Sequence, residues 1–282
     1  MIRILSDSTC DLSKELITRY NIEIIPLFVR LGEAEYLDGV NIAPESLYAW
    51  SDECGQTPQT AAPGIEDIMK VLNGNDDDEF IIFTISSPMS ACYNNCKLAS
   101  EELGMTDRVH VIDSQNLSTG IGLLIIEAAI MRDNGCSVGE IESYIINLRS
   151  KVRASFVVDT LTYLYRGGRC SGLAAMVGNT LKLHPRIAVV DGQMRPEQKY
   201  RGKPQKFVMD YVKDMEKNFL TAKSDRVFIT HSGCSEEILK MVSDYLTGLG
   251  YFKEILITRA GSVISSHCGP GTLGVLFIDN KN

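Results

Sequence analysis

Residues 80–85, with the sequence Phe-Ile-Ile-Phe-Thr-Ile, form a near-continuous apolar run that passes directly into Ser86-Ser87. Short apolar runs without polar alternation are typical of strands covered on both faces. Three similar runs lie at residues 2–5, 22–29 and 109–112. They alternate with stretches of helical spacing at residues 12–20, 44–51, 65–72, 90–103 and 118–133. This alternation predicts an α/β fold whose first half is a parallel sheet with flanking helices.

The second half of the chain has a different pattern. Ser137 and Glu140 predict a capped helix that ends near Ser150. Asp191-Gly192 is typical of a hairpin turn, and hairpins mixed with crossovers predict a mixed sheet. We therefore predict two α/β domains, residues 1–150 and residues 151–282. The expected strands of the second are 155–158, 187–190, 227–229, 254–258 and 273–278, and its expected helices are 172–181, 203–220 and 236–249.

Composition excludes several classes of protein. The chain has 282 residues, 44% hydrophobic and 23% charged, which is typical of a packed globular protein. Its net charge of -8, without a basic cluster interleaved with aromatic residues, argues against nucleic-acid binding. The longest apolar run, residues 121–131, is too short for a transmembrane segment and is interpreted as a buried helix. The N-terminus lacks the layout of a signal peptide, so we expect a cytoplasmic protein with reduced cysteines.

Small polar residues follow three of the predicted strands of the first half, at residues 6–9, 86–87 and 113–114. Ligands of open α/β sheets bind just past the carboxyl ends of strands, so these loops are expected to share one crevice. Ser90 lies at a predicted helix start, where its hydroxyl and the free N–H groups of the first turn could hold an anion. A simple N-cap is the alternative. The sequence contains no phosphate-loop, dinucleotide, nucleophile-elbow or zinc-protease motif.

Other candidate residues are ambiguous by themselves. His267 leads into Cys268-Gly269-Pro270-Gly271, where the glycines allow a ligand to approach the backbone, but a turn explains them equally well. Arg169 and Arg201 lie beside glycines and could meet a carboxylate or a phosphate, with a surface turn as the alternative. Asp11 fits an N-cap for the helix predicted at residue 12, and no metal site is expected.

Taken together, six segments resemble the bacterial DegV family of fatty-acid-binding proteins. Their order and spacing make the set specific, and the resemblance runs nearly end to end. The segments are Ser6-Asp7-Ser8-Thr9-Cys10-Asp11-Leu12, Ile85-Ser86-Ser87-Pro88-Met89-Ser90-Ala91-Cys92-Tyr93, Val111-Ile112-Asp113-Ser114, Gly167-Gly168-Arg169, Arg201-Gly202 and Ser266-His267-Cys268-Gly269-Pro270-Gly271.

The resemblance implies two α/β domains with one long-chain fatty acid held between them. Thr60 lies in a segment similar to the family's T-S-Q-P-S segment, and Ser90 corresponds to the serine of its S-G-T-Y segment. These two hydroxyls are expected to bind the carboxylate, and Arg201 and His267 are expected to complete the polar network, directly or through water. Here Ala61 and Gly64 replace both serines of the first segment, and Ala91-Cys92 replace Gly-Thr in the second.

The resemblance also implies a lipid carrier rather than a catalyst. It would need no cofactor, contact the membrane only transiently, and present the carboxylate to a separate fatty acid kinase, with Arg169 as a candidate docking residue. The alternative from another class is an enzyme, or a substrate-binding subunit similar to dihydroxyacetone kinases, that acts on a phosphorylated or carboxylated metabolite. His267 would then be the acid or base, and the helix start at Ser90 the anion site.

Overall fold

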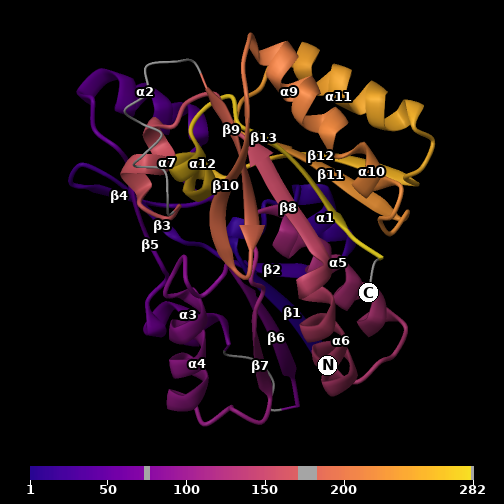
Figure 1. Ribbon diagram of the computed structural model, residues 1–282. Helices are drawn as coiled ribbons and strands as arrows, with labels where there is room; N and C mark the ends of the chain where they lie inside the picture. Colours follow the sequence, from indigo (N-terminus) through magenta and orange to yellow (C-terminus); the bar gives the residue numbers. More distant parts are fainter. Residues whose placement is uncertain (73–76, 171–182, 281–282) are drawn as a thin grey trace.

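The computed structural model describes residues 1–72, 77–170 and 183–280. Within these ranges the chain forms a parallel sheet, a mixed sheet and a small antiparallel sheet, with helices packed on their faces (Figure 1). The predicted fold class is confirmed, since a parallel sheet with flanking helices is followed along the chain by a mixed sheet.

The parallel sheet has the strand order β2-β1-β6-β7, and every pair in it is parallel. The run at residues 80–83 is fully buried in β6, as its lack of polar alternation predicts. The loops after β1 and β6 meet, because Ile85 N donates to Asp7 Oδ2 at 2.7 Å. The loops after β6 and β7 also meet, because Ser87 N donates to Asp113 Oδ1 at 3.1 Å. The strands are β1 (Ile2–Asp7), β2 (Ile22–Ile25), β6 (Glu79–Thr84) and β7 (Val109–Asp113).

The mixed sheet has the strand order β10-β9-β8-β13-β11-β12. Its β11 and β12 are parallel and the other neighbours are antiparallel. Asp191 and Gly192, both with positive φ, make the predicted turn between β9 and β10. The strands are β8 (Val152–Val157), β9 (His184–Val190), β10 (Gln193–Tyr200), β11 (Arg226–His231), β12 (Glu254–Arg259) and β13 (Leu273–Ile278).

Helix α5 (Thr119–Asp133) lies between the two large sheets and contacts β1, β6, β8 and β13. It is apolar on nearly all sides, which is typical of a helix that packs in a core. Its one buried carboxylate, Glu127, is neutralised by Arg226 Nη1 at 2.6 Å and by Lys223 Nζ at 2.5 Å. Among the helices in the described ranges, none has the length and apolar character of a membrane span.

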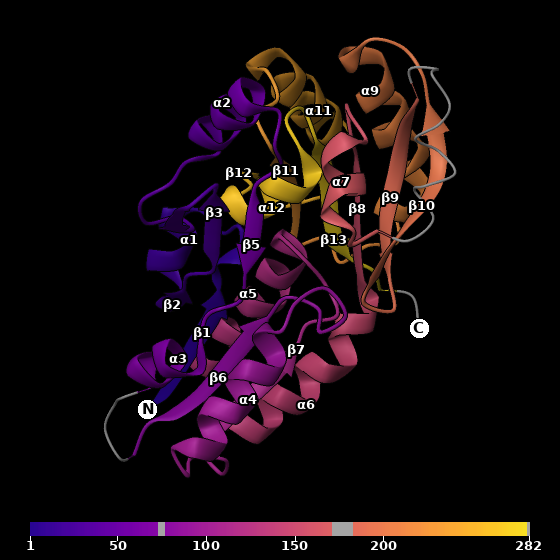
Figure 2. The same ribbon diagram turned by 90° about the vertical axis from the view of Figure 1, so that its left-hand side faces the viewer.

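The remaining helices pack on the sheets and on one another (Figures 1 and 2). Helices α3 and α4 pack on one face of the parallel sheet, and α9 and α11 pack on the mixed sheet. The helices are α1 (Lys14–Arg19), α2 (Pro44–Cys54), α3 (Ile65–Val71), α4 (Cys92–Glu102), α6 (Val138–Leu148), α7 (Thr162–Gly167), α9 (Pro204–Asp214), α10 (Glu216–Phe219), α11 (Glu236–Gly248) and α12 (Ser262–Cys268), with short 3-10 turns η1 (Ser8–Cys10) and η2 (Arg149–Lys151).

The apolar run at residues 22–29 is divided between two sheets, although the sequence predicts one strand. Pro26 has no N–H to donate to a ladder, and the chain leaves the parallel sheet after Ile25. It then enters a small antiparallel sheet of order β4-β3-β5 that the sequence pattern did not predict. The strands of this sheet are β3 (Phe28–Leu31), β4 (Ala34–Leu37) and β5 (Gln59–Ala61).

Three helix predictions differ from the structure or lie outside it. The helix predicted at residues 203–220 is divided into α9 and α10. The helix predicted at 12–20 begins at Lys14, and Ser13, not Asp11, is its N-cap, because Ser13 Oγ accepts from Leu16 N at 3.3 Å. The helix predicted at 172–181 lies outside the described residues. The division into domains at residue 151 stays a prediction. In the structure, α12 from the second half of the chain packs on β3 and β5 of the first half.

Candidate functional site

Helix α12 is held at its N-terminus by two buried carboxylates from the first half of the chain. Gly261 N donates to Asp11 Oδ1 at 2.8 Å, and Ser262 N donates to Asp38 Oδ1 at 2.7 Å. The oxygen atoms of these carboxyl groups accept from the free N–H groups at the start of the helix. This anchor fixes α12 against β3, β5 and α7 (Figure 2).

The anchored helix brings His267 against Thr60. The Thr60 Oγ1 atom lies 2.9 Å from His267 Nε2, within hydrogen-bonding distance, across 207 positions of the chain. Thr60 is held by its pairing with Val29 in the small antiparallel sheet. Both residues were predicted for the site from the family resemblance, and the structure places them in contact.

Thr60 and His267 line a cavity of about 200 Å³. Ser90 and Arg169 also line it, and Arg169 is the only charged side chain among the described lining residues. The remaining walls are largely apolar and come from both halves of the chain. They include Leu27, Ile85, Met89, Leu117, Met194, Val263 and Ile264.

A smaller cavity of about 30 Å³ shares three lining residues, Leu117, Ile264 and Cys268, with the first. Its walls include Phe156 of β8 and Leu276 of β13. The smaller cavity therefore neighbours the first one, on the side of the mixed sheet.

The His267 ring is neutral at physiological pH. Burial lowers its pKa to about 4, and the positive charge of Arg169 lowers the pKa in the same direction. The Nδ1 atom is buried and has no hydrogen-bond partner among the described residues. Gly167 lies against this atom so closely that a Cβ at position 167 would overlap it. Arg169 Nη1 donates to the Gly167 carbonyl oxygen at 2.7 Å, which keeps the guanidinium beside the ring.

Ser90 is not the N-cap of α4, although the sequence left that interpretation open. The cap position is Ala91, and the Ser90 hydroxyl accepts weakly from Cys92 N at 3.4 Å. Its Oγ also lies 3.1 Å from Cys92 Sγ. Either atom of this pair can be the donor, so the Ser90 hydroxyl hydrogen is available to a ligand only when Cys92 Sγ donates.

Nearly the whole chain is similar to proteins of one family. Residues 1–280 match the family described as "Uncharacterised protein, DegV family". The chain belongs to the DegV family. A DegV domain-containing protein of Clostridium perfringens is 30% identical over 280 residues, covering 99% of this chain and 98% of that protein.

The names of two further DegV relatives mention fatty acid binding. A protein of Thermotoga maritima named "Fatty acid-binding protein" is 30% identical, and the match covers 97% of this chain and 96% of that protein. A solved structure from Thermus thermophilus, named for fatty acid binding of a DegV family protein, has a TM-score of 0.90 and 29% identity. That match covers 99% of both chains.

The structure brings together four of the five residues predicted from the DegV resemblance. Thr60, Ser90, Arg169 and His267 line one cavity, and Arg201 does not appear among its described lining residues. Arg201 is exposed at the end of β10, so its role at the site stays a prediction.

The sequence did not identify Asp11 and Asp38 as the anchors of α12, although Asp11 lies within a motif of the DegV resemblance. Asp11 has a positive φ, and its partner Gly261 lies 250 positions away. No local sequence pattern predicts a contact over that distance. Met194 and Ile264 of the cavity were also missed, because they are ordinary apolar residues in a strand and a helix.

The cavity is suited to an amphipathic acid. Two hydroxyl groups, a neutral imidazole and one guanidinium line it, and no described carboxylate lines it to repel an anion. Apolar walls occupy the rest, which a hydrocarbon chain can contact without leaving polar groups unsatisfied.

Proposed function

We propose that the protein binds a long-chain fatty acid in this cavity. The carboxylate lies at Thr60, Ser90 and His267, and the chain runs along Leu117 and Ile264 toward the smaller cavity. The observation that carries the proposal is the contact between Thr60 and His267 at the end of an apolar cavity whose only described charge is positive. The relatives named for fatty acid binding support the same ligand.

The apolar walls supply the affinity. Burying about fifteen methylenes at about 0.8 kcal/mol each contributes about 12 kcal/mol before the cost of association. That cost is several kcal/mol at least, so a surplus remains for tight binding.

The polar end supplies orientation. A buried carboxylate without partners is heavily disfavoured, so it requires hydroxyl or charged donors. Thr60 and Ser90 can each donate one hydroxyl hydrogen, and Arg169 adds a positive charge at the cavity wall. In this proposal Arg201 completes the network directly or through water.

The finer proposal is that the protein presents the bound carboxylate to a separate fatty acid kinase and does not itself catalyse a reaction. Arg169 supports this step, because it is exposed and also lines the cavity beside His267. A partner that binds Arg169 would therefore reach the polar end of the ligand.

The test begins with solvent extraction of the purified protein and mass spectrometry of the extract, where a stoichiometric fatty acid is expected. Delipidated protein is then titrated with fatty acids of several chain lengths. The Thr60→Ala and Ser90→Ala variants should bind more weakly, and Thr106→Ala, at an exposed threonine outside the cavity, should bind normally.

The absence of both a recovered acid and saturable uptake at any chain length would overturn the proposal. Turnover of a carboxylated or phosphorylated metabolite without a kinase, abolished in His267→Ala, would instead favour the enzyme alternative.

A further inference from the structure

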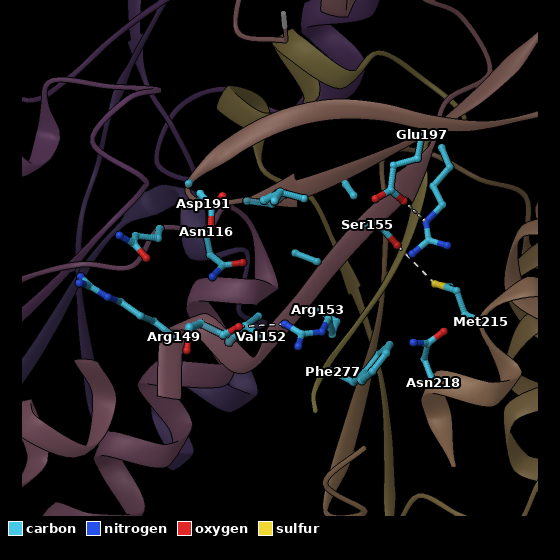
Figure 3. Close-up of a pocket in the computed structure, with 18 residues that line it drawn as sticks. Asn116, Arg149, Val152, Arg153, Ser155, Asp191, Glu197, Met215, Asn218 and Phe277 are labelled. Carbon is cyan, nitrogen blue, oxygen red and sulfur yellow. Dashed lines mark hydrogen bonds and ion pairs between the residues drawn. The ribbon is translucent and has the colours of Figure 1, made fainter. Parts of the chain in front are cut away.

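A second cavity, of about 330 Å³, lies on the face of the mixed sheet that α9 and α10 cover only in part (Figure 3). It is bounded by β8, β9, the turn between β9 and β10, and the end of α10. Gln115 and Asn116 line this cavity, and the next residue, Leu117, lines the apolar cavity. The two cavities are therefore separate sites on either side of one short loop.

Small residues form the floor of the second cavity. Ser155 of β8 is paired with Ala188 of β9 in the antiparallel register. Side chains two positions apart on a strand share a face, so Arg153 and Arg186 stand on the same face as this pair. Because the strands are antiparallel, the two arginines lie on opposite sides of the pair. The small side chains of Ser155 and Ala188 therefore leave space between the two guanidinium groups, both of which line the cavity.

The guanidinium groups retain donors for a ligand. Arg153 Nε lies 3.3 Å from Asp279 Oδ2, and its Nη1 donates to Ser150 O at 2.8 Å. Arg186 Nε lies 3.2 Å from Glu197 Oε2, and Glu197 is largely exposed. Arginine has five N–H groups, and these contacts use only part of them. The Arg186 side chain is half-buried and only its Glu197 partner is exposed, so a ligand is expected to use the Nη groups of Arg186 and leave this pair in place.

Asn116 contributes a hydrogen-bond acceptor, its Oδ1 atom, that accepts no hydrogen bond from the described residues. Its side chain is 3% exposed, and its Nδ2 donates to Ser114 O at 3.1 Å. Its Oδ1 is buried with no hydrogen-bond partner among the described residues. Figure 3 shows this amide directed toward the space between Asp191 and Arg153. A buried carbonyl oxygen without a partner is costly, so the position favours a ligand that brings a hydroxyl or an amine.

The guanidinium groups of the cavity favour an anion. Three arginines and two carboxylates line it, and Asp279 pairs with Arg153, so the attraction comes from the remaining N–H donors and not from an excess of positive charge. Guanidinium groups bind phosphate and carboxylate through paired N–H donors. A phosphate has more acceptor oxygens than a carboxylate and can therefore bridge two arginines.

We propose that this second cavity binds a small phosphorylated compound that carries a hydroxyl group. The phosphate lies over Ser155 between Arg153 and Arg186, and the hydroxyl donates to Asn116 Oδ1 after the buried amide turns toward the cavity. The proposal does not depend on the lipid ligand, because the residues that carry it do not line the apolar cavity.

The probe for the test is glycerol 2-phosphate, titrated into the full-length protein by calorimetry at low salt. Saturable binding with a dissociation constant below about 1 mM is expected. Inorganic phosphate, which lacks the hydroxyls, should bind more weakly, and glycerol should not bind. Arg153→Gln and Arg186→Gln should each weaken binding of the probe about tenfold.

The matched control is Arg195→Gln, which removes an exposed arginine of β10 that does not line the cavity. It should leave the dissociation constant unchanged within about twofold. Asn116→Leu, with its fold checked by circular dichroism, should abolish the advantage of glycerol 2-phosphate over inorganic phosphate. The absence of saturable binding by the probe, or equal losses in Arg186→Gln and Arg195→Gln, would overturn the proposal.

Discussion

Asp11 and Gly261 are joined by a hydrogen bond of 2.8 Å although 250 positions separate them in the chain. The second oxygen of the Asp11 carboxyl accepts from Ser118 Oγ at 2.5 Å. One buried carboxyl group therefore connects the first turn of the chain, the start of α5 and the start of α12. Since α12 carries His267, the geometry of the apolar cavity depends on this connection.

Asp11→Asn should change how stability depends on pH. Burial raises the pKa of Asp11 from 3.8 to about 8. A raised carboxyl pKa favours the folded state at low pH, and this contribution is lost as pH rises through the folded value. The free energy of unfolding of the native protein should therefore fall between about pH 5 and pH 8 relative to that of Asp11→Asn. Urea titrations across this range measure the difference. The exposed Asp52→Asn is the control, and identical slopes for Asp11→Asn and the native protein would contradict the anchor.

Thr60→Val should lower the affinity for a fatty acid by about tenfold, because it removes one hydrogen bond to a charged group and preserves shape. Valine suits the strand position, but it leaves the buried His267 Nε2 without its hydrogen-bond partner, so the free energy of unfolding should fall by about 1–3 kcal/mol. The methyl ester of the same acid provides the sharper measurement. The native protein should prefer the acid to the ester, and Thr60→Val should reduce that preference. An unchanged preference would mean that Thr60 does not contact the carboxylate.

Much of the fold follows from local pattern. The run at residues 80–85 predicts a buried parallel strand because its length and composition leave no polar face, and Asp191-Gly192 predicts its hairpin because both residues tolerate positive φ. The small antiparallel sheet was not predicted, since its exposed strand β4 has little apolar pattern and Pro26 interrupts the run that leads into β3.

The candidate site, like the fold, could be predicted from the sequence only in part. Ser90 and His267 were candidates from local pattern, but Thr60 came from the family resemblance alone, because its contact with His267 spans 207 positions. Asp38 is the clearest example of a contact that the sequence could not predict. Its partners are Ser8 and the N–H of Ser262, and nothing near Asp38 in the sequence indicates a helix 224 positions away.

Binding of a fatty acid should be accompanied by proton uptake at His267. In the unliganded protein, burial lowers the pKa of His267 from 6.5 to about 4, so the ring is neutral at pH 5.5. A carboxylate bound beside the ring favours the protonated form and raises that pKa. Calorimetry in buffers of different ionisation enthalpy measures the protons taken up. Uptake at about pH 5.5 should be greater in the native protein than in His267→Gln. Equal uptake in the two proteins would place the carboxylate away from the ring.

Gly167→Ala should weaken fatty acid binding, because its new methyl group overlaps His267 Nδ1 and must displace the ring from Thr60. Gly168→Ala is the matched control. Gly168 has a positive φ of 66° but no atom lies within 4 Å of the position of a Cβ, so this variant should lose stability without moving the ring. Both variants are measured for the free energy of unfolding and for affinity. Loss of affinity in Gly167→Ala alone shows that Gly167 positions His267, whereas equal affinities would show that α7 and the ring can move apart without affecting the ligand.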